Sequence, residues 1–110
     1  MSNEISYEEL SSKIQAGAPL TLVEVLPARH FANGHLPRAI NLPLDAVPQA
    51  APELLPDPSR EVVLYCAGPT CSNSHVAARE LTQRGYANVR VFSGGKEAWV
   101  QAGNSLEVAS

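Results

Sequence analysis

Both cysteines of the chain stand close together in one uncharged stretch, LYCAGPTCSNSH, at positions 66 and 71. No Asp, Glu, Lys or Arg lies between Glu61 and Arg79. The thiolate is the nucleophilic form of cysteine, and backbone N–H groups with a nearby helix N-terminus stabilise it. Because Gly68-Pro69 permits a tight turn, we predict a curled loop whose amides bind an anionic sulfur and lower the pKa of Cys66. This anion-binding loop consists of Ala67, Gly68, Pro69, Thr70, Cys71 and Ser72.

Two interpretations are open for each thiol. Cys66 is either a nucleophile or a small apolar residue that ends a buried strand. Cys71 is either idle or a resolving thiol, which attacks a persulfide on Cys66 and leaves a disulfide. A disulfide requires Cα atoms about 4.4–6.8 Å apart, and the ends of a curled loop can satisfy this. We expect no metal site, because the chain has no C-x-x-C pair and the spacing fits no usual zinc module.

The elements around this loop alternate between strand and helix. Short apolar runs predict strands over residues 20–25, 39–42, 61–65 and 88–92. Capping and glycine signals predict helices over residues 6–17, 28–32, 45–55, 72–85 and 94–103. This alternation predicts an α/β fold, a small parallel β-sheet of about five strands with helices on both faces. Ligands bind beyond the carboxyl ends of such strands, which is where the two cysteines lie.

The composition is typical of one soluble domain. With 110 residues, 45% of them hydrophobic, and a net charge of −3, the chain has no basic face for nucleic acid and no polybasic membrane patch. We expect a single domain over residues 1–104 and a loose C-terminal tail over 105–110. The N-terminus lacks the apolar run of a signal peptide, and no segment approaches the roughly 20 apolar residues that span a bilayer. We therefore expect a cytoplasmic protein with reduced thiols.

Three stretches, in order, resemble the single-domain rhodanese family of sulfurtransferases across nearly the whole chain. Residues 23–43 contain the G-H-L-P-x-A-x-N pattern of that family's upstream motif. Residues 62–74 resemble its catalytic strand and loop, and residues 85–103 resemble its closing strand, double glycine and tryptophan helix. The resemblance implies a rhodanese-like fold with Cys66 at the position of the cysteine that carries the persulfide.

The resemblance also implies a reaction and its partners. In this family the cysteine takes a sulfane sulfur from a donor such as thiosulfate, polysulfide or a protein persulfide. It then passes the sulfur to a thiophilic acceptor, such as a protein or low-molecular-weight thiol, and no metal or organic cofactor is needed. The six-residue loop matches the sulfurtransferases, whereas the related phosphatases have a longer loop closed by an arginine. Glu24 stands where the family's acidic residue supports the neighbouring loop.

Two departures from the family pattern concern its arginines. Cys71 stands where many rhodaneses have an arginine at the end of the loop, and Leu26 stands where the usual Asp-x-Arg has its arginine. Loss of one charge-assisted contact to a dianionic donor costs about 1.5–3 kcal/mol. We therefore expect weak thiosulfate turnover. Arg29, one turn further along, is a candidate replacement for the missing charge.

His75 lies in the first turn of the helix after the loop. It either assists proton transfer with an incoming donor or is an ordinary solvated helix residue. Two other functions compete with sulfur transfer: a thiol–disulfide redox protein or sensor that uses the Cys66/Cys71 pair, and a non-catalytic rhodanese-like binding module. Replacement of Cys71 by serine abolishes a redox role but spares persulfide formation, and the presence of Cys66 counts against the binding module.

Overall fold

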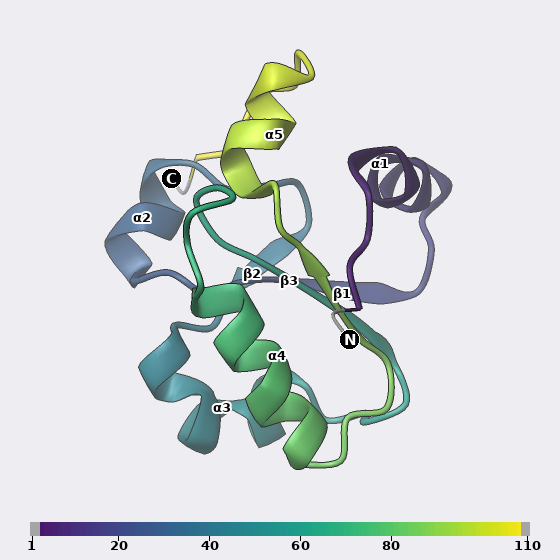
Figure 1. Cartoon of the computed structure of the whole chain (residues 1–110), viewed down its shortest axis with the longest axis vertical. Coiled ribbons are helices and arrows are strands. Elements are labelled where there is room, and N and C mark those ends of the chain that lie inside the picture. Colours follow the sequence, from purple (N-terminus) through teal and green to yellow (C-terminus); the bar gives the residue numbers. More distant parts are fainter. Residues whose placement is uncertain (1–2, 109–110) are drawn as a thin grey trace.

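The computed structural model describes residues 3–108, which form an all-parallel sheet covered by helices (Figure 1). Within these residues the sheet has four strands, in the order β2-β1-β3-β4, rather than about five as expected. The strands are β1 Leu20–Glu24, β2 Ala39–Asn41, β3 Glu61–Tyr65 and β4 Val89–Phe92. Glu24 pairs with both Asn41 and Tyr65, and Tyr65 pairs with Phe92. The carboxyl ends of all four strands therefore lie at one edge of the sheet.

Helices cover both faces of the sheet, as the alternating sequence predicts. They are α1 Tyr7–Ala16, α2 Ala28–Asn33, the 3-10 turn η1 Leu44–Ala46, α3 Val47–Leu54, α4 Asn73–Gln83 and α5 Gly95–Gln101. Helices α1 and α5 lie on one face, and α3 and α4 lie on the other (Figure 1). Strand β3 contributes side chains to the cores on both faces. Val63 and Tyr65 belong to the core covered by α1 and α5. Val62 and Leu64 belong to the core covered by α3 and α4. None of the helices in the described part of the chain is long and apolar enough to cross a membrane.

Local signals set the ends of α1 as predicted. The Ser6 hydroxyl accepts a hydrogen bond from the Glu9 backbone N–H at 3.1 Å, which caps the first turn. Gly17 ends the helix in the left-handed region, with φ of 69°. The other predicted elements agree with the observed bounds to within two residues at either end.

The N-terminal segment lies along the outer edge of β4. Ile5 N–H donates to the Val91 carbonyl, and Val91 N–H donates to the Asn3 carbonyl, both at 2.9 Å. The edge strand of the sheet therefore has a short parallel partner that sequence patterning did not indicate.

The C-terminal segment is also attached to the domain. His35 and Glu107 exchange two backbone hydrogen bonds of 2.8 Å. Leu106 packs against Gly34, where a Cβ atom would lie 2.9 Å from its side chain. The expectation of a loose tail is therefore wrong for residues 105–107, while residues 109 and 110 lie outside the described residues.

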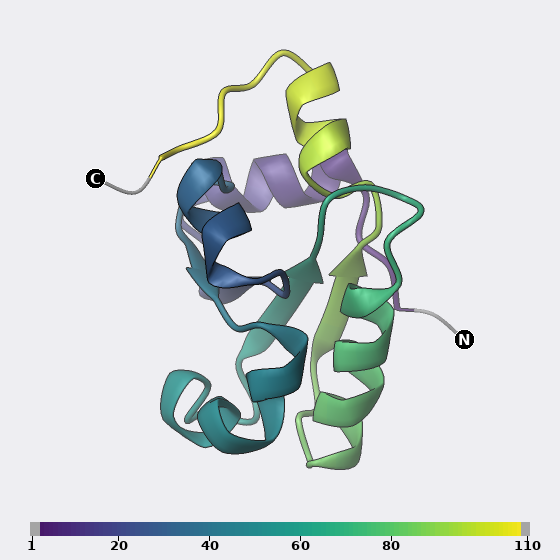
Figure 2. The ribbon, with the colours of Figure 1, turned by 90° about the vertical axis from the view of Figure 1, so that its left-hand side faces the viewer.

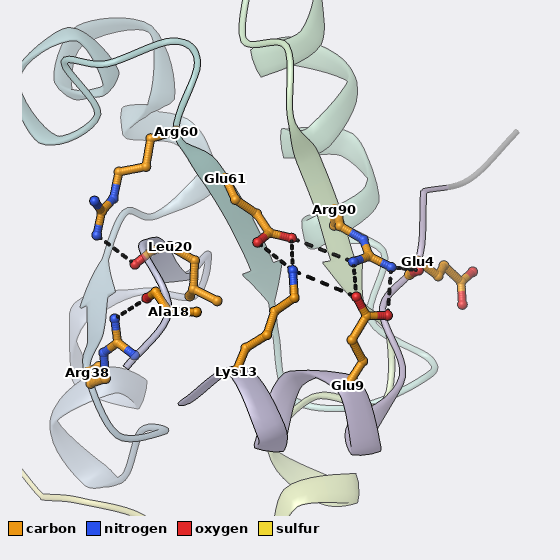
Figure 3. Close-up of polar contacts among 9 residues, drawn as sticks. All are labelled: Glu4, Glu9, Lys13, Ala18, Leu20, Arg38, Arg60, Glu61 and Arg90. Carbon is orange, nitrogen blue, oxygen red and sulfur yellow. Dashed lines mark hydrogen bonds and ion pairs between the residues drawn. The ribbon is translucent and has the colours of Figure 1, made fainter. Parts of the chain in front are cut away.

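Charged side chains join α1 to the amino ends of β3 and β4 (Figure 3). Lys13 Nζ lies 2.8 Å from a Glu61 carboxylate oxygen. Arg90 lies 2.6 Å from Glu9 and 3.6 Å from Glu61. The hydrogen bond from Arg90 holds the pKa of Glu9 below its usual value. Because Glu61 begins β3 and Cys66 follows its last residue, this network and the thiol lie at opposite ends of the strand.

Candidate active site

Cys66 directly follows the last residue of β3, at the carboxyl end of the sheet. Figure 2 shows the loop that runs from this end of β3 to the start of α4. It is only 2% exposed. Its thiol donates to the backbone carbonyl of Cys71, with Sγ 3.4 Å from that oxygen, and the Ser74 hydroxyl lies 3.5 Å from Sγ. The structure thus brings together the two predicted cysteines and a buried serine that sequence reasoning missed.

Burial dominates the electrostatics of this thiol. Removal from water raises the pKa of Cys66 above its ordinary value, and the neighbouring Cys71 thiol raises it further. The hydroxyl and backbone N–H of Ser74 act in the opposite direction. The prediction of a lowered pKa is therefore wrong, because burial removes more solvation than the Ser74 donors replace.

The loop between β3 and α4 is a turn closed by a 3.1 Å hydrogen bond from Cys71 N–H to the Gly68 carbonyl. Ser72 precedes α4 as predicted, but its side chain makes no capping hydrogen bond. The amide of Ser74, in the first helical turn, acts on the Cys66 sulfur instead. The Cys71 carbonyl faces the same sulfur, so donor and acceptor groups both surround it. The remaining loop residues are exposed: Ala67, Pro69, Thr70 and Ser72.

The start of α5 holds the first part of this loop in place. The Lys96 backbone N–H donates to the Cys66 carbonyl at 3.1 Å, and the Glu97 N–H donates to the Ala67 carbonyl at 2.9 Å. Gly95 has a φ of 59°, and a Cβ atom there would collide with the Cys66 carbonyl oxygen. The second glycine of the Gly94-Gly95 pair is therefore required both for its backbone conformation and for its contact with the loop.

Glu24 is fully buried at the carboxyl end of β1, next to the loop strand. The Tyr65 hydroxyl donates to its Oε1 at 2.8 Å. Its Oε2 lies 2.9 Å from Lys96 Nζ, and that ammonium group also donates to the His30 carbonyl at 2.8 Å. Burial beside this carboxylate raises the pKa of Tyr65 well above its ordinary value, so the phenol stays protonated and keeps donating. Glu24 thus links β1 to β3 through Tyr65 and to α5 through Lys96.

Sequence reasoning missed Lys96 as the partner of Glu24. The motif comparison showed that the arginine expected two residues after Glu24 is absent, because position 26 is a leucine. A buried carboxylate at that position needs a cation from elsewhere. Lys96 lies at the start of the double-glycine helix, which begins at the same edge of the sheet as Glu24. The position of that helix was the signal that could have identified Lys96 as the partner.

Arg29 and His75 are not among the partners of the Cys66 thiol. Arg29 is exposed in the first turn of α2 and makes no hydrogen bond or ion pair with the described residues. His75 is half-buried and lines a groove between α4 and β4, together with Arg79 and Val91. The hydrogen-bond partners of the Cys66 thiol are Cys71 and Ser74, not His75.

Known proteins share this arrangement of sequence and fold. The family model for the rhodanese-like domain matches residues 6–102. A protein of Allochromatium vinosum named sulfurtransferase is 34% identical over 103 residues, which are 94% of this chain and 92% of that protein. A Candida albicans protein named adenylyltransferase and sulfurtransferase is 32% identical over 99 residues, which cover 86% of this chain but only 23% of that protein.

Solved structures agree with the sequence comparisons. The crystal structure of the BH2092 protein of Bacillus halodurans superposes with a TM-score of 0.89 at 28% identity, covering 97% of this chain and 77% of that one. The fold, the order of the three motifs and the extent of the family match all point to the same conclusion. The chain belongs to the rhodanese-like domain family.

Proposed function

We propose that this protein is a sulfurtransferase that carries a sulfane sulfur as a persulfide on Cys66. The observation that carries the proposal is the position of Cys66, a thiol at the carboxyl end of a central parallel strand with the Ser74 hydroxyl 3.5 Å from its sulfur. The Ser74 backbone N–H also lowers the pKa of this thiol. Those two donors stabilise negative charge on sulfur, either on the thiolate or on the persulfide. The name of the Allochromatium relative supports the same reaction class.

The reaction has two displacement steps. In the first, the Cys66 thiolate attacks the sulfane sulfur of the donor, a bond forms to Cys66 Sγ, and the donor remnant leaves with the electron pair. In the second, a nucleophilic acceptor attacks the outer sulfur of the persulfide, and the Cys66 thiolate leaves. No net oxidation of the protein occurs, and its reactive form is the reduced thiol. We place the protein in the reducing cytoplasm for that reason.

The donor we favour is a polysulfide or a protein persulfide rather than thiosulfate. The loop has no Lys or Arg, and the arginine candidate Arg29 makes no hydrogen bond or ion pair with the described residues. The Lys96 ammonium is held by Glu24 and the His30 carbonyl beneath the loop. A dianionic donor therefore has only backbone and hydroxyl donors to bind. The acceptor we propose is a protein or low-molecular-weight thiol.

Mass spectrometry of the intact protein tests this proposal. Reduced wild-type protein, Cys66→Ser and Cys71→Ser are incubated separately with thiosulfate and with inorganic polysulfide. We expect Cys71→Ser to gain one sulfur atom from polysulfide, the wild type to gain one in samples taken at the start of the incubation, and Cys66→Ser to gain none. Little gain from thiosulfate would support the proposed donor class. No gain in any form of the protein would leave a binding module as the function.

A further inference from the structure

The curled loop brings Cys71 close to Cys66, whose Sγ lies 3.4 Å from the Cys71 carbonyl oxygen. Cys71 is half-buried and contacts the hydrophobic core cluster to which Cys66 and Ala77 belong. The turn that ends on Gly68 folds the loop back and places the Cys71 carbonyl 3.4 Å from Cys66 Sγ. The thiols also act on each other, since Cys71 contributes to the raised pKa of Cys66. The loop therefore holds Cys71 next to Cys66, with the Cys71 side chain partly buried against the core.

We propose that Cys71 is a resolving thiol that converts the Cys66 persulfide into a Cys66–Cys71 disulfide and releases sulfide. This inference rests on the proposed function, because it needs a persulfide on Cys66. In the step, Cys71 Sγ forms a bond to Cys66 Sγ, and the bond from Cys66 Sγ to the outer sulfur breaks. The outer sulfur leaves with the electron pair and takes the Cys71 proton, so it departs as hydrosulfide. The sulfane sulfur is reduced by two electrons, and the two cysteine sulfurs are oxidised to the disulfide.

The cycle closes with a dithiol reductant. Its first thiolate attacks the Cys66–Cys71 disulfide, its second displaces the resulting mixed disulfide, and both cysteines return to thiols. The sum of the steps is a sulfane sulfur and a dithiol giving sulfide and an oxidised dithiol. A persulfide on Cys66 then has two fates: transfer when an acceptor arrives first, and release as sulfide when Cys71 attacks first.

One tryptic fragment reports on both thiols. Trypsin releases residues 61–79 together, because no Lys or Arg lies between Arg60 and Arg79. Reduced protein is loaded with inorganic polysulfide and rapidly desalted to remove the donor and all small thiols. The fragment is then followed over time by mass spectrometry while released sulfide is measured. The proteins compared are the wild type, Cys66→Ser, Cys71→Ser and Cys71→Ala.

In the wild type we expect the added sulfur to disappear from the fragment as a form lacking two hydrogen atoms appears, with stoichiometric release of sulfide. In both Cys71 variants the added sulfur should persist at least about tenfold longer, with sulfide near background. Cys71→Ala shows whether this effect depends on the new hydroxyl of Cys71→Ser. If a variant does not fold, the wild-type time course decides alone.

The outcomes separate the two proposals. A wild-type persulfide that lasts as long as that of Cys71→Ser, with no disulfide in the fragment, overturns the resolving role and leaves sulfur transfer intact. Absence of added sulfur from every protein, including both Cys71 variants, overturns the proposed function itself. A disulfide between two protein molecules, visible on a non-reducing gel, would also contradict the resolving role.

Discussion

At the scale of single residues, the balance between burial and stabilisation of charge decides how Cys66 behaves. The thiol is nearly closed to water, and its raised pKa keeps the thiolate fraction small at neutral pH. A thiolate of higher pKa is also the stronger nucleophile once it forms. The donors of Ser74 partly offset burial, whereas the neighbouring Cys71 thiol adds to its effect.

The first prediction concerns the pH dependence of Cys66. In the Cys71→Ser background, we expect the rate of alkylation by iodoacetamide to rise with a midpoint above about 8.5, the value of an unperturbed thiol. Addition of Ser74→Ala should move this midpoint higher, because it removes a donor that favours the thiolate. A midpoint below that value would show that the loop amides outweigh burial.

The raised pKa of Cys66 also makes the stability of the protein depend on pH. Below the pKa of the unfolded thiol, both states are protonated and Cys66 contributes no slope. Above it, the unfolded chain loses its proton first, so the free energy of unfolding falls as pH rises toward the higher folded pKa. Urea unfolding of the wild type and Cys66→Ala across this range should show a steeper decline in the wild type, because groups other than Cys66 titrate equally in both proteins.

The second prediction tests the missing loop arginine. We expect Cys71→Arg to raise kcat/KM for thiosulfate about tenfold or more over Cys71→Gln, because one charge-assisted contact is worth about 1.5–3 kcal/mol. Cys71→Gln is the matched control, since it adds a long side chain without charge. Equal turnover by both variants would mean that loop charge does not select the donor. The readout is thiocyanate formed with cyanide as acceptor.

Residue identities could be predicted from the sequence more readily than residue environments. The two cysteines and Glu24 were identified from motif positions, and the structure brings the cysteines into contact. The direction of the Cys66 pKa shift was wrong, since burial of a loop residue depends on what packs over it. Ser74 was missed for the same reason: nothing in SNSH distinguishes the serine that faces the thiol from the one that faces solvent.

At the scale of elements, α5 acts as a support for the β3–α4 loop although it lies almost thirty residues further along the chain. Its first amides bind the carbonyls of Cys66 and Ala67, and Gly95 allows the close approach. This support turns the first two loop carbonyls toward α5 and away from the start of α4.

The third prediction compares two glycines with similar backbone conformations. Gly17 and Gly95 have φ values of 69° and 59°, but a Cβ atom at Gly17 would meet nothing within 4 Å. Gly17→Ala should therefore show only the cost of a left-handed residue, about 1–2 kcal/mol. Gly95→Ala should lower stability further and slow sulfur loading of Cys66, because the new methyl group displaces the Cys66 carbonyl. Equal losses would argue against this contact, and urea unfolding with loading kinetics measures both effects.

The fourth prediction concerns the ion pair that links β1 to α5. Lys96→Met leaves the Glu24 carboxylate buried without its cation, and we expect a loss of about 3 kcal/mol in unfolding free energy. The double variant Glu24→Gln/Lys96→Met should recover much of this loss, because it removes both charges. A double variant no more stable than Lys96→Met would show that the unpaired Glu24 charge is not the cause of the loss, and the Glu24→Gln single variant completes the cycle.

Element types and their order could be predicted because their signals are local. The capping box at Ser6 and Glu9 and the alternating apolar runs each lie within a few residues of the element that they define. The pairing of Lys96 with Glu24 and of Glu107 with His35 joins residues about seventy positions apart. Such contacts have no local pattern, so they escape prediction from one sequence.

At the scale of the whole molecule, the charge network and the thiol occupy opposite ends of the sheet. Glu61 receives both Lys13 and Arg90 at the amino end, whereas the loop at the carboxyl end is uncharged. Substitutions in the charge network are therefore expected to change stability without changing sulfur chemistry.

The fifth prediction tests this separation. Glu61→Gln removes the acceptor shared by two cations and should lower the unfolding free energy by about 1 kcal/mol, an effect that salt should reduce. Glu80→Gln is the control, since its exposed pair with Arg84 should contribute less than about 0.5 kcal/mol. Sulfur loading of Cys66 should be unchanged in both variants. Slower loading in Glu61→Gln would show that the two ends of the sheet are coupled.

The N-terminal segment along β4 has a consequence for how separate molecules behave toward one another. An uncovered edge strand presents a row of unpaired N–H and C=O groups, which can recruit a strand from a neighbouring chain. In this protein Asn3 and Ile5 occupy the outer hydrogen-bonding groups of Val91, and β2 at the other edge is only three residues long. Both edges of the sheet are thus poor templates for intermolecular strand pairing, which protects the folded domain from edge-to-edge aggregation.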